Sequence, residues 1–210
     1  MSEYRSIAGE VPGEYEEKKS RFIATIRPVS SEEEAVSFIN EMKKKYWDAR
    51  HNCSAFVIGD RGELTRCSDD GEPSGTAGRP MLEILTNEGL TYVCAVVTRY
   101  FGGVLLGTGG LVRAYQAAVK DGLSNAEIVA SRECFLCELC SDYTLLQKLK
   151  RLFEQEPFIL KDIIYEDTVK YSLMIPCDEI ERAKEIVTEA VNGKENLEIR
   201  GKEYCTVSIH

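Results

Sequence analysis

The apolar positions in the second half of the chain repeat with two periods, one typical of strands and one typical of helices. Alternation at every second residue predicts strands, whereas apolar residues three and four apart predict helices with one buried face. In chain order these patterns predict strand, helix, strand, strand, helix, strand, which is the ferredoxin-like arrangement. The predicted strands are residues 134–140, 158–165, 169–175 and 197–209, and the predicted helices are residues 143–153 and 178–191.

The first half of the chain is less regular and holds most of the glycines. Ser31 followed by Glu34 is the capping-box pattern that begins a helix, and Asp60-Arg61-Gly62 between two apolar segments predicts a hairpin. The predicted strands are residues 21–26, 53–58, 63–67 and 91–100, and the predicted helices are residues 31–46, 80–85 and 108–126. We therefore predict an α+β fold with two domains, residues 1–130 and residues 131–210.

Composition limits the classes of partner. The 210 residues carry a formal net charge of -9, and both predicted domains are acidic. A surface of this kind does not attract nucleic acid or an anionic membrane indiscriminately, although a local basic site remains compatible with it. The longest unbroken apolar run, residues 93–97, is too short to span a bilayer. The N-terminus lacks the pattern of a signal peptide, so we expect a cytoplasmic protein without a membrane partner.

Eight cysteines raise the question of a metal centre, because Cys134, Cys137 and Cys140 have the spacing C-x-x-C-x-x-C. Three thiolates at this spacing could bind zinc or an iron–sulfur cluster. The segment is apolar enough to be a strand, however, and residues three apart on a strand point to opposite faces. We therefore favour burial of these cysteines in the core over a metal site.

The most unusual segment, residues 99–113, places glycines between a predicted strand and a predicted helix. Free N–H groups at the start of such a helix attract anions, and Arg99 and Arg113 add positive charge. The segment matches neither the P-loop nor the dinucleotide-binding fingerprint. A glycine-rich turn required only for tight packing is the alternative interpretation. The candidate anion-binding residues here are Arg99, Tyr100, Phe101, Gly102, Gly103, Gly107, Thr108, Gly109, Gly110 and Arg113.

Two other segments contain candidate chemistry. Asp69, Asp70 and Glu72 in the loop 68–80 could bind a hard cation or act as an acid–base pair. A solvated loop held by Asp, Ser and Gly turn interactions is the favoured interpretation. His51 and Cys53 could form a thiolate nucleophile, but the apolar strand around Cys53 favours burial.

These three segments resemble the IMPACT family of the bacterial YigZ type, over residues 48–53, 68–80 and 97–115. The resemblance implies an N-terminal domain like the fourth domain of elongation factor G and a C-terminal domain like its fifth. Eukaryotic relatives act in translational control by competing for the activator of an amino-acid-starvation kinase. For bacterial members the resemblance implies association with nucleic acid or the ribosome and no settled catalytic activity. Likeness of fold alone does not assign function.

The leading hypothesis is a non-enzymatic cytoplasmic regulator that binds RNA, the ribosome or a translation-associated protein. We predict no catalytic residue, no metal and no cofactor. Tyr100 and Phe101 are available to stack on bases. The alternative is a small-molecule or nucleotide-binding enzyme that uses the glycine-rich turn as a phosphate site and Asp69 or Asp70 as a base. The arginines that we expect to contact an anion or RNA are Arg50, Arg79, Arg99 and Arg113.

Overall fold

The computed structural model describes residues 3–193 and 197–208. The chain divides into two compact units between Ala130 and Ser131, and the described residues after Thr206 group with the N-terminal unit and not with residues 131–206. This point lies inside a single strand, β7 (Ile128–Ser141). Each unit has its own hydrophobic core, and each is described separately below.

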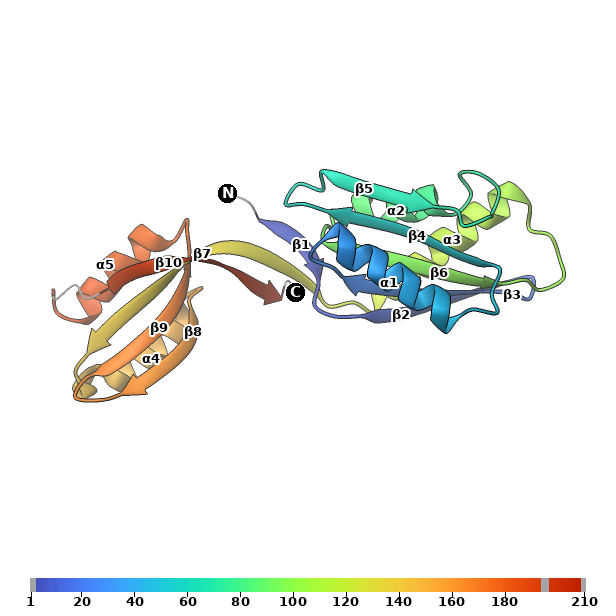
Figure 1. The fold of residues 1–210 in the computed structure, drawn as a ribbon. Helices are drawn as coiled ribbons and strands as arrows, with labels where there is room; N and C mark the ends of the chain where they lie inside the picture. The colour runs from blue at the N-terminus through green and yellow to red at the C-terminus, as the bar shows by residue number, and fades with distance from the viewer. Residues whose placement is uncertain (1–2, 194–196, 209–210) are drawn as a thin grey trace. The chain divides into compact units, whose positions relative to one another are not determined.

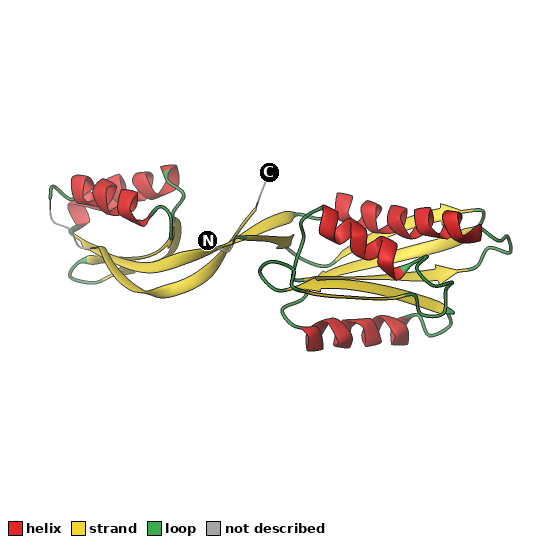
Figure 2. Cartoon of the chain, turned by 90° about the horizontal axis from the view of Figure 1, so that it is seen from above, coloured by secondary structure: helices red, strands yellow, loops and turns green. Residues whose placement is uncertain are grey.

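The N-terminal unit is built on an antiparallel sheet in the order β2-β3-β6-β4-β5. One helix packs on one face of this sheet and two helices pack on the other, so the unit has three layers (Figures 1 and 2). The first strand, β1 (Tyr4–Ile7), pairs with β7 and not with this sheet. The elements of the sheet and its layers are β2 (Val11–Glu17), β3 (Ser20–Pro28), α1 (Glu32–Lys45), β4 (His51–Ile58), β5 (Leu64–Ser68), α2 (Gly78–Asn87), β6 (Val93–Tyr100) and α3 (Gly107–Ser124).

The central strand β6 is apolar on both faces because helices cover both sides of the sheet. Val93, Ala95 and Val97 belong to the core shared with α2 and α3. Cys94 and Val96 point the other way and contact α1. A strand buried on both sides reads as a continuous apolar run, which is the pattern that the sequence shows here.

Helix α1 begins as the sequence predicts, with a difference in its cap. The Ser31 hydroxyl accepts a hydrogen bond from the Glu34 N–H at 3.3 Å. The Glu34 carboxylate, however, accepts from the N–H and hydroxyl of Ser30 and not from Ser31. The reciprocal half of the predicted capping box is therefore shifted by one residue toward the N-terminus.

Helix α3 lies unusually close to β2 because two glycines face each other. A Cβ atom built on Gly13 would lie 2.3 Å from the backbone nitrogen of Gly122. No side chain fits between the two backbones at this point. Gly122 also faces Ile26 of β3, so this end of α3 is held against two strands.

The C-terminal unit has the ferredoxin-like topology that the sequence predicts. Its sheet has the order β10-β7-β9-β8. Helices α4 and α5 pack on one face of this sheet, where Leu149, Phe153, Ala183 and Val187 are buried (Figure 2). The two-domain α+β fold class is confirmed. The elements of the unit after β7 are α4 (Leu146–Gln155), β8 (Ile159–Tyr165), β9 (Val169–Pro176), α5 (Ile180–Ala190) and β10 (Leu197–Ser208).

Three expectations about local structure are corrected. Strand β2 was not predicted, because Pro12, Gly13 and several charged residues obscure its pattern, and an edge strand tolerates proline. The helix expected at residues 143–153 starts with a separate 3₁₀ turn at Tyr143–Leu145. Strand β7 is also longer than the predicted 134–140, because it extends toward the N-terminus to Ile128.

The cysteine-rich strand behaves partly as expected. Cys134 and Cys137 do point to opposite faces, since they belong to different hydrophobic clusters. Cys134 is buried as expected, but it is not a free thiol, because it forms a disulfide with Cys205 of β10. This pairing removes Cys134 from any three-thiolate set. In the part of the chain that the structure describes, no group of three or more Cys, His, Asp or Glu side chains is placed to bind a metal.

None of the helices among the described residues combines the length and the apolar composition needed to cross a lipid bilayer.

Candidate functional site

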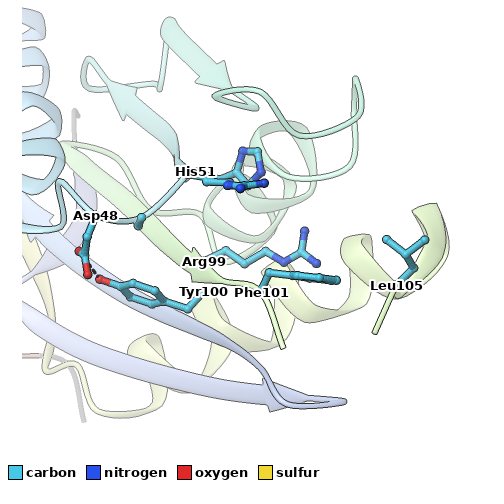
Figure 3. A pocket seen from close by; sticks show the side chains of 8 residues that line it. Asp48, His51, Arg99, Tyr100, Phe101 and Leu105 are labelled. Atoms are coloured by element: carbon cyan, nitrogen blue, oxygen red, sulfur yellow. Dashed lines mark hydrogen bonds between the residues drawn. The ribbon is translucent and has the colours of Figure 1, made fainter. Parts of the chain in front are cut away.

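A pocket of about 600 Å³ opens where β4 begins and β6 ends (Figure 3). The two strands are antiparallel neighbours, and their register places His51 opposite Arg99. The Tyr100 hydroxyl donates a hydrogen bond to Asp48 at 2.8 Å, and this bond raises the pKa of Tyr100. The residues lining the pocket are Asp48, Ala49, Arg50, His51, Arg99, Tyr100, Phe101 and Leu105.

Beneath the pocket lies a buried polar network centred on Glu72. Arg99 Nη1 donates to Glu72 Oε1 at 2.6 Å, and the two side chains are only 8% and 3% exposed. The Tyr115 hydroxyl, from α3, donates to the same oxygen at 2.9 Å. Cys53 in turn contacts the Tyr115 hydroxyl at 3.3 Å. Burial raises the pKa of Tyr115 strongly, so its hydroxyl stays protonated and acts as a donor.

This network corrects two expectations. The loop 68–80 was expected to be solvated, but Glu72 is a buried residue of the domain core. Arg99 was expected to supply positive charge to an anion, but Glu72 neutralises that charge. A buried charge is tolerated only when it is paired and hydrogen-bonded, which explains why the two residues occur together.

Arg99 nevertheless retains unused hydrogen-bonding capacity. Within the described residues, the bond to Glu72 is the one hydrogen bond of its side chain, and its buried Nε has no partner. The guanidinium lies between two rings, with Cζ 5.5 Å from the centre of Phe22 and 5.7 Å from the centre of Phe101. Figure 3 shows it beside Phe101, with His51 across the pocket.

His51 is held by a loop and not by the neighbouring cysteine. Its Nδ1 lies 3.0 Å from the carbonyl oxygen of Asp70, and a carbonyl can only accept, so Nδ1 carries the proton. Cys53 donates its thiol hydrogen to the carbonyl of Asp69 at 2.9 Å. Burial raises the pKa of Cys53 to about 12, so this thiol is not ionised at neutral pH. These contacts do not support a Cys53 nucleophile activated by His51.

Asp69 and Asp70 serve the loop that contains them. Burial opposes ionisation of Asp69, but hydrogen bonds from the N–H groups of Gly75, Gly78 and Ala77 outweigh it and lower the pKa of Asp69. Asp70 accepts from the N–H of Asn52 at 2.7 Å and pairs with Lys43 at 2.6 Å. Neither carboxylate lines the pocket. A carboxylate with a lowered pKa is a poor general base, which disfavours the role considered for Asp69 in an enzyme.

The glycine-rich segment divides into a fixed part and an open part. A Cβ on Gly102 would lie 2.0 Å from the backbone of Lys19, so Gly102 is required for packing. Gly103 and Gly107 have positive φ angles, +86° and +71°, with no atoms near their open sides. We call residues 103–107 the flap. Two of its apolar side chains, Val104 and Leu105, are 48% and 83% exposed, whereas the third, Leu106, packs against the domain core. The flap lies between β6 and α3 in Figure 1, and its last residue, Gly107, begins α3.

The structure brings together some of the predicted binding residues and separates others. Arg50, Arg99, Tyr100 and Phe101 line the pocket. The remaining two arginines are exposed and do not line it: Arg79 pairs with Glu83 on α2, and Arg113 lies on the first half of α3. Helix α3 begins at Gly107, one residue earlier than predicted, and no side chain caps its N-terminus. Thr108, Gly109 and Gly110 form its first turn.

A basic and aromatic surface beside the pocket was missed in the sequence. The last turn of α1 carries Lys43, Lys44 and Lys45, all exposed. Trp47, which precedes the pocket residue Asp48, is 82% exposed. The run of three lysines followed by two aromatic residues was the available signal, but it reads equally well as the solvated end of a helix. We call Lys43, Lys44, Lys45 and Trp47 the α1 patch.

The fold and the pocket thus define a two-domain α+β protein whose N-terminal domain carries a basic, aromatic site. Comparison with known protein families identifies the family of this chain. Residues 18–123 match the Impact N-terminal domain, and residues 141–194 match a domain of unknown function that has a family model of its own. The chain belongs to the IMPACT family, which confirms the resemblance seen in its sequence.

Relatives and a solved structure agree with this membership. The chain is 44% identical over 180 residues to the IMPACT family member YvyE of Bacillus subtilis, covering 86% of this chain and 83% of the relative. It is 42% identical over 142 residues to YigZ of Escherichia coli, covering 66% and 69%. A crystal structure of a hypothetical protein is similar over 100% of this chain and 98% of its own, with 31% identity and a TM-score of 0.61.

The similarity to eukaryotic members is narrower. The Protein IMPACT homolog of Dictyostelium discoideum is 39% identical over 95 residues, which is 43% of this chain and 27% of the relative.

Proposed function

We propose that this protein is a non-enzymatic, cytoplasmic regulator linked to translation, and that it contacts RNA, free or within the ribosome, through its N-terminal domain. The link to translation is carried over from the family, whose eukaryotic members act in translational control. Contact with RNA is the part that the site itself supports. The contact surface consists of the pocket at the ends of β4 and β6 together with the α1 patch.

The observation that carries the proposal is the meeting of cationic and aromatic side chains at one place on an acidic protein. Arg50 and Arg99, the second of which is paired with Glu72, line the same pocket as Tyr100 and Phe101. Proteins that bind single-stranded nucleic acid combine a basic track for the phosphates with aromatic rings on which bases stack. The α1 patch repeats the same combination beside the pocket, with three lysines and Trp47.

The net charge of -9 is consistent with this interface when the contact is local. Lys44, Lys45 and Arg50 of the interface are exposed, although the charge of Lys45 also acts on Glu41 of the same helix. Lys43 is partly neutralised by Asp70. A small number of phosphate contacts produces modest affinity that weakens as salt is added.

The proposal is tested by titrating labelled single-stranded RNA and purified ribosomes with the full-length protein at low salt. The test variant is Arg50→Ala with Phe101→Ala, because both side chains are exposed and neither belongs to the buried network. The matched control is Arg79→Ala, which removes one exposed positive charge outside the pocket. We expect the double variant to weaken binding about tenfold or more, since one stacked base contributes about 1 to 3 kcal/mol. The control should change binding less than about twofold.

Salt dependence supplies a second measurement on the same samples. Removing one phosphate-binding side chain should reduce the slope of log affinity against log salt by about 0.7 for a single strand. The proposal is wrong if the wild-type protein binds neither RNA nor ribosomes at low salt. It is equally wrong about the surface if the control and the double variant bind alike.

A further inference from the structure

The pocket combines two kinds of chemistry. Arg50 and Arg99 offer N–H donors, and Phe101, which lies beside Arg99, and Leu105 offer apolar surface. A nucleotide has the same division, with an anionic phosphate at one end and a flat apolar base at the other. A volume of about 600 Å³ lies within the range of sites that hold small organic ligands.

One of the donors of the pocket, Arg99, has an N–H group without an acceptor in the structure. Arg99 is only 7% exposed, and its Nε has no hydrogen-bond partner among the described residues. Because Nη1 is committed to Glu72, the Nε edge of the guanidinium fork is the part left for another acceptor. Buried donors of this kind are rare in folded proteins, and an arginine fork fits two oxygens of one phosphate.

The apolar side chains of the pocket are incompletely buried. Phe101 is 57% exposed and Leu105 is 83% exposed, although both line the pocket. Leu105 belongs to the flap, whose terminal glycines both have left-handed φ angles and no atoms near their open sides. Closing the flap over a flat ligand would remove these apolar side chains from water, which favours a ligand with an apolar face.

We propose that the pocket binds a single unstacked nucleotide unit, with its phosphate at Arg50 and the free edge of Arg99, and its base between Phe101 and the flap. Because the Arg99 Nε is buried in this structure, its contact with the phosphate requires the Phe101 ring beside it to move. The proposal rests on the proposed function, and it specifies the ligand as the nucleotide unit of a single strand. In a duplex the bases are paired and stacked, so their faces cannot reach Phe101.

The same chemistry occurs in a free nucleotide and in a nucleotide within an RNA strand, so the experiment separates the two. Full-length protein is titrated with AMP, adenosine, ribose 5-phosphate, a short oligoadenylate, and the same strand annealed to its complement. Binding is followed by calorimetry and by the fluorescence of Trp47, the one tryptophan of the chain, which adjoins the pocket residue Asp48. The variants are Phe101→Ala and Leu105→Ser, with Arg79→Ala as the charge control.

The expected result is that the oligoadenylate binds at least about tenfold more tightly than the duplex, because only its bases can stack on the protein. AMP should compete at millimolar concentration, and adenosine and ribose 5-phosphate should each compete at least about tenfold more weakly, since each lacks one half of the ligand. Phe101→Ala should weaken AMP and the oligoadenylate together, and Leu105→Ser should do so to a smaller extent. Thermal unfolding of each variant must match the wild type, which both exposed positions allow.

Three outcomes overturn the inference in distinguishable ways. If the oligoadenylate binds, AMP does not compete and Phe101→Ala has no effect, the single-nucleotide site is wrong and the proposed contact with RNA stands. If AMP binds and neither RNA nor ribosomes bind, the pocket chemistry is right but its ligand is a free nucleotide, and the proposed function fails. Equal binding of duplex and single strand would show that the phosphate backbone alone is recognised, and Phe101 and the flap would then have no role in binding.

Discussion

Two loops of the N-terminal domain are unusual in sequence, and the structure uses them in opposite ways. The acidic loop between β5 and α2 is fixed, because Asp69 accepts three backbone hydrogen bonds and Glu72 is buried against Arg99 and Tyr115. The flap between β6 and α3 leaves Val104 and Leu105 exposed. Polar groups turned inward mark a loop that supports the fold, whereas apolar groups turned outward mark a loop that is available to a ligand.

The largest effect that tests this contrast is expected at Glu72. Glu72→Ala leaves Arg99 buried without its counter-ion, and breaking a buried pair in this way costs about 3 to 5 kcal/mol of unfolding free energy. Urea denaturation followed by circular dichroism measures the loss. Glu83→Ala, which breaks the exposed pair with Arg79, should cost no more than about 0.5 kcal/mol.

A double variant sharpens the result at Glu72. Replacing both partners, Glu72→Met with Arg99→Met, removes the unpaired charge and should restore part of the stability. If Glu72→Ala is no more destabilising than Glu83→Ala, the network does not support the domain.

A smaller effect is expected within the glycine-rich segment itself. Gly102→Ala forces a Cβ against the backbone of Lys19 and should cost at least about 1 to 3 kcal/mol. Gly103→Ala meets no atoms and should cost only the strain of its positive φ angle, about 1 to 2 kcal/mol. Equal losses at the two positions would mean that the segment has no boundary between a fixed part and a flap. Chemical denaturation of both variants decides this.

The next effect depends on pH and concerns Asp69. Asp69→Asn loses part of the acceptor that holds three N–H groups and should cost about 1 to 2 kcal/mol at neutral pH. Because the pKa of Asp69 is lowered in the folded protein, its contribution is complete above its ordinary pKa of 3.8 and is lost as the pH falls through the lowered value. The difference between wild type and variant should therefore be constant near neutrality and shrink in acid. A difference that grew in acid would contradict this assignment.

The smallest effect on stability is expected in the flap. Leu105→Ser replaces a side chain that is 83% exposed and should change the unfolding free energy by no more than about 0.5 kcal/mol. Differential scanning calorimetry is sensitive enough to detect a larger loss. A loss comparable to that of Gly102→Ala would show that the flap belongs to the packed core.

The two domains differ in how far their structure could be predicted from the sequence. In the C-terminal domain the apolar period specifies each element, since helices cover only one face of the sheet and the other face can be polar. In the N-terminal domain β2 combines Pro12, Gly13 and charged residues, so its pattern carries no strand period. Its pairing with β3 depends on contacts with α3 that are distant in sequence.

The candidate site was predicted only in part, for a similar reason. The segments that form it were recognisable because their glycines and arginines are unusual, but their convergence depends on the register of β4 and β6. Nothing local distinguishes Glu72, which is buried, from Asp70, which faces Lys43. The separation of Arg79 from the pocket is equally a tertiary property, because α2 carries it on an exposed face.

The facing glycines of β2 and α3 have a consequence for the distant pocket. Gly122 anchors one end of an 18-residue helix that is about 27 Å long, and Gly107, at the other end, is where the flap begins. A helix of this length is stiff, so a displacement where α3 packs against Gly13 moves the whole helix. The same helix carries Tyr115, whose hydroxyl donates a hydrogen bond to Glu72, and Glu72 in turn pairs with Arg99. A methyl group added at Gly13 would have to displace α3 from β2, and we expect Tyr115 on the same helix to carry part of that displacement to the candidate site.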